Sequence, residues 1–262
     1  MGTTTDKTGE TRLPLAEQRR RNLPAGAALG WLSAGWRDLW STPLPSLLYG
    51  LAVFLLSAAV VWGLFRMELD YILFPALAGF MVVGPLVAIG LYRKSRDLED
   101  GIAPSLSRMI FVKAESGAQV WYTGAILCLL MLVWMRAAVI IYALFMGLRP
   151  FPGLDHIVTM LTTTPEGLGM IVVGTAVGGL FAAFSFAIST FAIPMLLAER
   201  TDAFTAMGTS ISLTFRNLPV MLAWGAIVLG LTALALATGL LGLIVIFPLL
   251  GHGTWHSYRA IR

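Results

Sequence analysis

Two histidines near the C-terminus, His252 and His256, have the spacing that most readily suggests chemistry. A helix that continues through this segment would place both imidazoles on one face, because residues four apart are neighbours on a helix. Such a pair can bind a metal ion or supply ligands to haem. The same segment holds Trp255, Tyr258 and Arg259, and this composition is also typical of an aromatic belt at a membrane interface. The sequence leaves both interpretations open.

Arg136 is a second candidate functional residue, because it falls within a long apolar stretch. A charge among transmembrane helices is costly, so it marks a functional site by default. The apolar stretch continues to Leu148, however, and is long enough to extend past the bilayer. Arg136 can therefore also be an anchor whose guanidinium reaches the outer interface beside Trp134.

A third pattern is a row of small side chains at a spacing close to one helical turn. Its members are Gly174, Gly178, Ala182, Ser185 and Ser189. Small residues let helix backbones approach closely, so this face is predicted to pack against another helix. It could alternatively line a path for a small solute.

The sequence contains no complete catalytic motif. It has no glycine-rich phosphate loop ending in Lys, no His-Glu-x-x-His motif and no serine nucleophile elbow. No pair of carboxylates lies within the apolar tracts. These absences favour a non-enzymatic protein.

The elements that must position these residues follow from the spacing of charge. The chain is 57% hydrophobic and 12% charged, whereas soluble domains carry about 25% charged residues. Five tracts lack Asp, Glu, Lys and Arg: 39–65, 71–92, 116–135, 167–198 and 217–258. Each can cross the hydrocarbon core, which takes about 20 residues, and the last can cross twice with a turn at Thr238–Gly239. We therefore predict an all-α transmembrane bundle of six spans.

The distribution of Lys and Arg predicts the orientation of these spans. With the N-terminus inside, the outer loops hold only Arg66 and Arg149, and Arg136 lies within a span. The rest of the eighteen basic residues lie in segments on the inside. Cytoplasmic loops are enriched in basic residues, so both termini are predicted to be cytoplasmic. The net charge of +4 then indicates contact with anionic lipid rather than with nucleic acid.

Composition divides the chain into a polar tail, residues 1–24, predicted to be disordered, and one transmembrane domain, residues 25–262. Within the domain, amphipathic segments at 27–41, 102–113 and 203–217 each precede a pair of apolar tracts. We interpret this as three tandem units, each an interfacial helix followed by a helical hairpin. Short loops of any bundle with paired spans would also look amphipathic.

The sequence resembles an uncharacterised family of bacterial inner-membrane proteins. The resemblance rests on residues 83–96, 134–145, 193–197 and 251–259, and it extends over nearly all of the chain from about residue 27. It implies a multi-pass protein of the bacterial inner membrane. Some members have been labelled cytochrome c oxidase subunits, but this chain has only three histidines, too few for a catalytic haem-copper subunit. The label would fit only an accessory or assembly partner of a respiratory complex.

The leading hypothesis is an accessory, assembly or envelope-organisation factor that acts by contacts within the bilayer. A small-solute transporter or permease is the first alternative, and a redox protein that binds haem or metal through His252 and His256 is the second. No cofactor is expected under the first two hypotheses.

Overall fold

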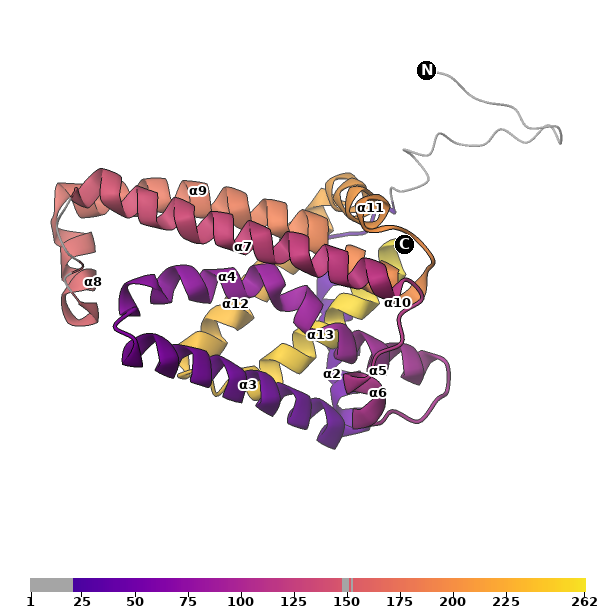
Figure 1. Cartoon of the computed structure of the whole chain (residues 1–262). Helices are drawn as coiled ribbons and strands as arrows, with labels where there is room; N and C mark the ends of the chain where they lie inside the picture. Colours follow the sequence, from indigo (N-terminus) through magenta and orange to yellow (C-terminus); the bar gives the residue numbers. More distant parts are fainter. Residues whose placement is uncertain (1–20, 148–150, 152) are drawn as a thin grey trace, which may run out of the picture.

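The computed structural model describes residues 21–147, 151 and 153–262, and every regular element in that part of the chain is a helix (Figure 1). The all-α prediction is therefore confirmed. Residues 1–20 of the predicted tail lie outside the described residues. Arg21, the first described residue, contacts two distant parts of the chain: its backbone N–H donates to Asn217 Oδ1 at 2.9 Å, and its Nε donates to the Ile261 carbonyl at 3.2 Å.

Five helical segments are long and apolar enough to cross a membrane. They are α3 (Pro43–Arg66), α4 with α5 (Leu73–Val87 and Ile89–Glu99, preceded by the 3-10 helix η1, Asp70–Ile72), α7 (Gly117–Met146), α9 with α10 (Pro165–Ser189 and Ala192–Ala198), and α12 (Leu218–Ala237). The sixth predicted span forms α13 (Leu243–Ile261), which is too polar from His252 onward to qualify by composition. Five spans are thus supported, and the sixth stays a prediction.

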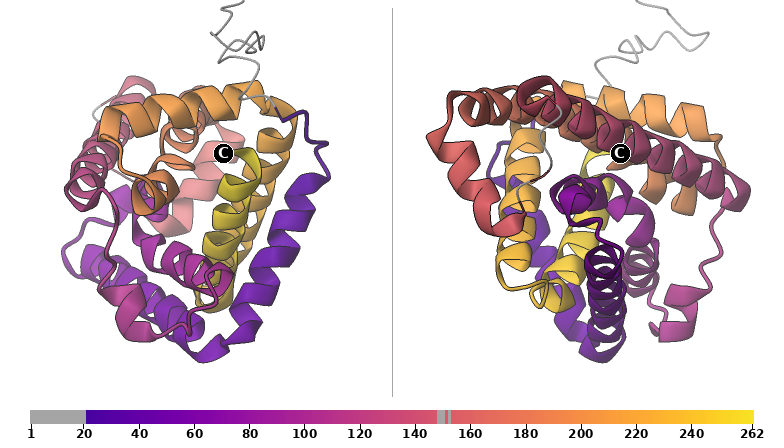
Figure 2. Two further views of the ribbon diagram at one scale, coloured as in Figure 1. Left: turned by 90° about the vertical axis from the view of Figure 1, so that its right-hand side faces the viewer. Right: turned by 60° about the vertical axis from the view of Figure 1, so that its left-hand side comes forward.

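The short helices gather at the two ends of the bundle. α2 (Ala27–Ser41), α5, α6 (Leu106–Ile110), α10 and α11 (Ala203–Arg216) lie at the end where the C-terminus lies (Figures 1 and 2), which we call the terminal end. α8 (Leu154–Thr163) lies at the opposite end, packed against the start of α9. Between the two ends, α4 packs against α7, and α7 against α9.

α13 is the centre of packing at the terminal end, where it contacts α2, α3 and α5. The largest fully buried side chains there include Trp224, Trp255 and Tyr92, none of which is more than 1% exposed. Toward the α8 end the helices instead expose apolar side chains, such as Leu168 and Leu144. Exposed apolar surface of this extent is expected where lipid is the solvent.

The predicted amphipathic segments differ from one another. Segments 27–41 and 203–217 correspond to α2 and α11, whereas 102–113 contains only the single turn α6. α2 exposes Trp36 and Trp40, whose rings lie edge to face, and buries Leu39. The three-unit repeat remains a prediction.

Candidate functional site

His252 and His256 both lie on α13, and α13 continues as a helix through them. The His252 side chain is fully buried, with Nε2 2.9 Å from Ser46 Oγ on α3 and Nδ1 2.9 Å from Ser95 Oγ on α5. His256 is partly exposed, and its Nε2 lies 2.8 Å from Asp38 Oδ2 on α2. The two imidazoles therefore have different partners.

These contacts belong to one hydrogen-bonded chain, which we call the polar chain. Lys94 Nζ donates to Ser46 Oγ at 2.7 Å, and the Ser95 hydroxyl donates to Asp38 Oδ2 at 2.6 Å. Because Ser46 accepts from Lys94, its own hydrogen is free to donate to His252 Nε2. Because Ser95 donates to a carboxylate, its oxygen accepts from His252 Nδ1. The network thus assigns His252 as the neutral tautomer protonated at Nδ1.

Lys94 begins the polar chain as a buried ammonium. It has no exposed surface, and its second partner is the Thr42 carbonyl at 2.7 Å. Its charge is connected to the carboxylate of Asp38 only through the two serines and His252. A buried charge is tolerated only where hydrogen bonds replace its hydration, and the polar chain supplies them while joining α2, α3, α5 and α13.

Asp38 ends the polar chain outside the candidate spans. Burial raises the pKa of the Asp38 carboxyl, but hydrogen bonds from His256 and Ser95 outweigh burial and hold the pKa below its ordinary value. Asp38 is therefore ionised at neutral pH and balances the ammonium of Lys94.

The polar chain resembles the serine–imidazole–carboxylate order of a hydrolase, but the geometry does not favour catalysis. Ser46 and His252 are both fully buried, and neither lines the two cavities described below. A metal at His252 would have to displace a hydroxyl from either ring nitrogen. No group of three or more His, Cys, Asp or Glu side chains in the described part of the chain could hold a metal ion.

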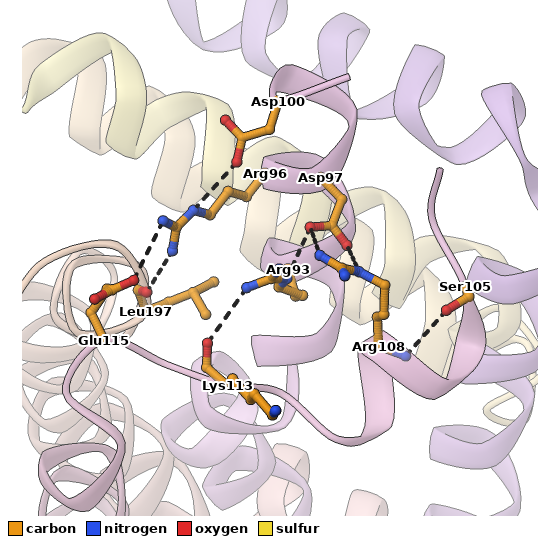
Figure 3. A network of polar contacts seen from close by, with 9 residues as sticks. All are labelled: Arg93, Arg96, Asp97, Asp100, Ser105, Arg108, Lys113, Glu115 and Leu197. Carbon is orange, nitrogen blue, oxygen red and sulfur yellow. Dashed lines mark hydrogen bonds and ion pairs between the residues drawn. The ribbon is translucent and has the colours of Figure 1, made fainter. Parts of the chain in front are cut away.

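A second polar cluster ties α5 to α6 and α10 (Figure 3). Asp97, buried to 1% exposure, accepts two hydrogen bonds from the guanidinium of Arg108 at 2.7 and 2.8 Å and pairs with Arg93 at 2.9 Å. Arg96 donates to the Leu197 carbonyl at 2.9 Å. These basic side chains are therefore held by groups of the protein itself.

Arg136 lies apart from both polar clusters, on an exposed face of α7. It makes no hydrogen bond or ion pair with any described residue. It stands nineteen residues beyond Gly117, the first residue of α7, or about 28 Å at about 1.5 Å per residue. This distance from the terminal end matches the far side of a hydrocarbon core of about 30 Å.

The small residues of α9 line a cavity, which we call the inner cavity. All five of them, Gly174, Gly178, Ala182, Ser185 and Ser189, contribute to its wall. Its volume is about 480 Å³, and its other walls come from α4, α5, α7, α12 and α13. Ser185 and Ser189 donate to carbonyls one turn back within α9, so their hydroxyls are already satisfied.

An outer cavity of about 580 Å³ lies toward the α8 end, between η1, α4, α7, α8 and α9. Trp134, Gly174 and Thr175 line both cavities. In the described part of the chain, no Asp, Glu, Lys, Arg or His lines either one. An ionic solute would find no counter-charge in these cavities.

Residues 73–198 match the family DUF2189, described as "predicted integral membrane protein". No curated protein and no solved structure matches the chain. The resemblance to an uncharacterised membrane family is thereby confirmed, and the oxidase label gains no support from it.

The DUF2189 segment runs from α4 to α10. It includes Lys94, Arg136 and the small-residue face of α9. It leaves out α13 with both histidines, although residues 251–259 belong to the resemblance seen in the sequence.

Sequence reasoning missed most of the polar chain. Asp38, Ser46, Lys94 and Ser95 are far apart in sequence from the histidines, and 93–100 looks like an ordinary charged loop. The available signal was the i, i+4 pair of Arg93 and Asp97, which indicates a helix at that position rather than a loop.

Proposed function

We propose that this chain is a non-enzymatic membrane protein that holds an uncharged apolar molecule from the bilayer in its inner cavity. The observation that carries the proposal is the inner cavity, whose wall includes all five small residues of α9. Such a face allows close helix packing, yet no atom lies within 4 Å of where a side chain on Gly174 would begin. The volume falls within the range of about 300–1,000 Å³ usual for small-molecule sites.

A pair of glycine substitutions tests this proposal. Gly174→Leu fills space shared by both cavities, whereas Gly230→Leu adds the same side chain on an exposed part of α12 outside both cavities. Native mass spectrometry of protein purified from its own membrane should show a bound apolar molecule. We expect Gly174→Leu to lose it and Gly230→Leu to keep it. Wild-type protein without bound molecules, or equal retention by both variants, contradicts the proposal.

The accessory role within a membrane complex is the form of this function that we favour, with a respiratory complex as one possible partner. The transporter alternative gains from the outer cavity, because two adjoining cavities on α9 can hold a molecule at two depths. Co-purification of a partner lost in Gly174→Leu supports the accessory role. Flux of an uncharged solute into vesicles supports transport.

We infer that the terminal end faces the cytoplasm of a bacterial inner membrane. The support is the contact of Arg21 with Ile261 and Arg262, which places the start and end of the described chain together. If all five candidate spans between them cross the membrane, this contact supports a sixth crossing by α13. The positive-inside rule then assigns that end to the cytoplasm, next to anionic lipid.

A further inference from the structure

Trp134 of α7 is the wall between the inner and outer cavities. Its Nε1 donates to the Pro75 carbonyl on α4 at 3.1 Å. Its ring packs against Phe181 of α9, with centroids 5.7 Å apart. A Cβ on Gly178 would lie 2.9 Å from Trp134 Cη2, so the ring covers α9 at that glycine. The indole therefore bridges α4 and α9 where one cavity gives way to the other.

The two cavities form one track along α9 on either side of this ring. The outer cavity touches α9 from Met170 to Thr175, and the inner cavity touches α9 and the residue after it from Gly174 to Thr190. Twenty residues of helix span about 30 Å, at about 1.5 Å per residue. That length equals the thickness of the hydrocarbon core, about 30 Å.

The chemistry of the track indicates what occupies it. Neither cavity is lined by a charged side chain among the described residues, so the part of a ligand that enters must be uncharged. Next to the inner cavity, α9 exposes Leu180 to 72%, and Leu229 of α12, which lines the cavity, is 59% exposed. These side chains lie in candidate spans and face lipid. The hydrocarbon that surrounds them in a membrane is the acyl chain of a phospholipid.

We propose that Trp134 sets the length of the phospholipid acyl chain that the inner cavity accepts. This inference rests on the proposed function, because it assumes that the cavity holds a ligand. A chain in the inner cavity runs along the small residues of α9 and stops at the indole ring. Without the ring the cavity continues into the outer cavity, and a longer chain fits.

Competition between two lipids tests the inference. Purified protein is mixed with equal amounts of dilauroyl- and distearoyl-phosphatidylcholine, and native mass spectrometry measures the ratio of the two bound lipids. Hydrophobic pockets discriminate single methylenes by about tenfold or more. We expect Trp134→Ala to shift the ratio toward stearoyl chains by about tenfold. Trp134→Leu, which keeps an apolar side chain in case the alanine variant does not fold, should shift it in the same direction.

Trp62→Ala is the matched control, because Trp62 is 66% exposed on α3 and lines neither cavity. It should leave the ratio unchanged. An unchanged ratio in both Trp134 variants overturns the role of Trp134 while leaving lipid binding intact. Wild-type protein that binds neither lipid, or binding that Gly174→Leu does not reduce, overturns the phospholipid acyl chain as the occupant. Only protein purified from its own membrane without any bound apolar molecule overturns the proposed function itself.

Discussion

His252 and His256 share a helix face but not an environment, and this difference can be measured. Replacing His252 with Ala leaves two buried hydroxyls, Ser46 and Ser95, each without one partner. Unsatisfied buried polar groups cost about 1–3 kcal/mol each, so we expect His252→Ala to lower the free energy of unfolding by about 2–5 kcal/mol.

His256→Ala is the comparison, because it removes one partly exposed contact to Asp38. It should cost about 1 kcal/mol. Unfolding followed by circular dichroism in mild detergent measures both values. Equal losses for the two variants would mean that His252 is not held as the polar chain requires.

Glu199, just after α10, lies at the terminal end and predicts that the stability of the protein depends on pH. Arg262 donates to both of its oxygens at 2.9 and 2.8 Å and lowers the pKa of the Glu199 carboxyl, aided by Tyr258. Because the pKa of Glu199 is lower in the folded protein than in the unfolded chain, ionised Glu199 stabilises the fold. This stabilisation is complete above the pKa of the unfolded chain, near 4.5, and is lost as the pH falls through the lower pKa of the folded protein.

We therefore expect the melting temperature of the wild type to fall more steeply below about pH 4.5 than that of Glu199→Gln, because an unfolded Glu titrates near 4.3. At pH 7 the variant should be the less stable of the two. Parallel acid profiles would show that the ion pair contributes nothing to folding.

At the scale of elements, the contact between α2 and α13 depends on close backbone approach. A Cβ on Gly35 would lie 2.6 Å from the Gly253 nitrogen, whereas nothing lies within 4 Å of one on Gly30 of the same helix. We expect Gly35→Ala to destabilise the protein by about 1–3 kcal/mol, the usual cost of overpacking. Gly30→Ala should be neutral or stabilising by up to about 1 kcal/mol, because Ala favours helix.

Thermal unfolding of the two alanine variants side by side checks this expectation. A stable Gly35→Ala would mean that α2 lies on the membrane without docking on α13. Amphipathic periodicity was enough to predict α2 as a helix. It could not show that Leu39 is buried while Trp36 is exposed, because both belong to the same apolar face of the helix.

The structure around α5 could likewise be predicted only in part from the sequence. The apolar tract 71–92 predicted a span here, and the structure divides it into α4, which runs through Pro85 to Val87, and α5, which begins at Ile89. The sequence could not show that the break turns Lys94 and Ser95 into the protein interior. A run of charged residues after an apolar tract is ordinarily a solvated loop.

For the whole molecule, the contact between Arg21 and the chain end predicts an even number of crossings. A cysteine added after Arg262 and one added before Met1, each in a Cys128→Ser background, should react with an impermeant thiol reagent from the same side of the membrane. Labelling from opposite sides would mean that α13 does not cross, and that five spans are the full number.

The sequence by itself determined that the protein lies in a lipid bilayer, that it is helical and roughly where the apolar spans begin and end. A bilayer requires apolar helices of a certain length without charged residues, and both properties can be read from the sequence. It also singled out the small residues of α9. Only the tertiary structure decided that those residues line a cavity, that Arg136 is exposed, and that His252 lies between two serines. These outcomes depend on which helices pack against each other. Helical periodicity predicts which face of a helix is buried, but it does not predict which other helix covers that face.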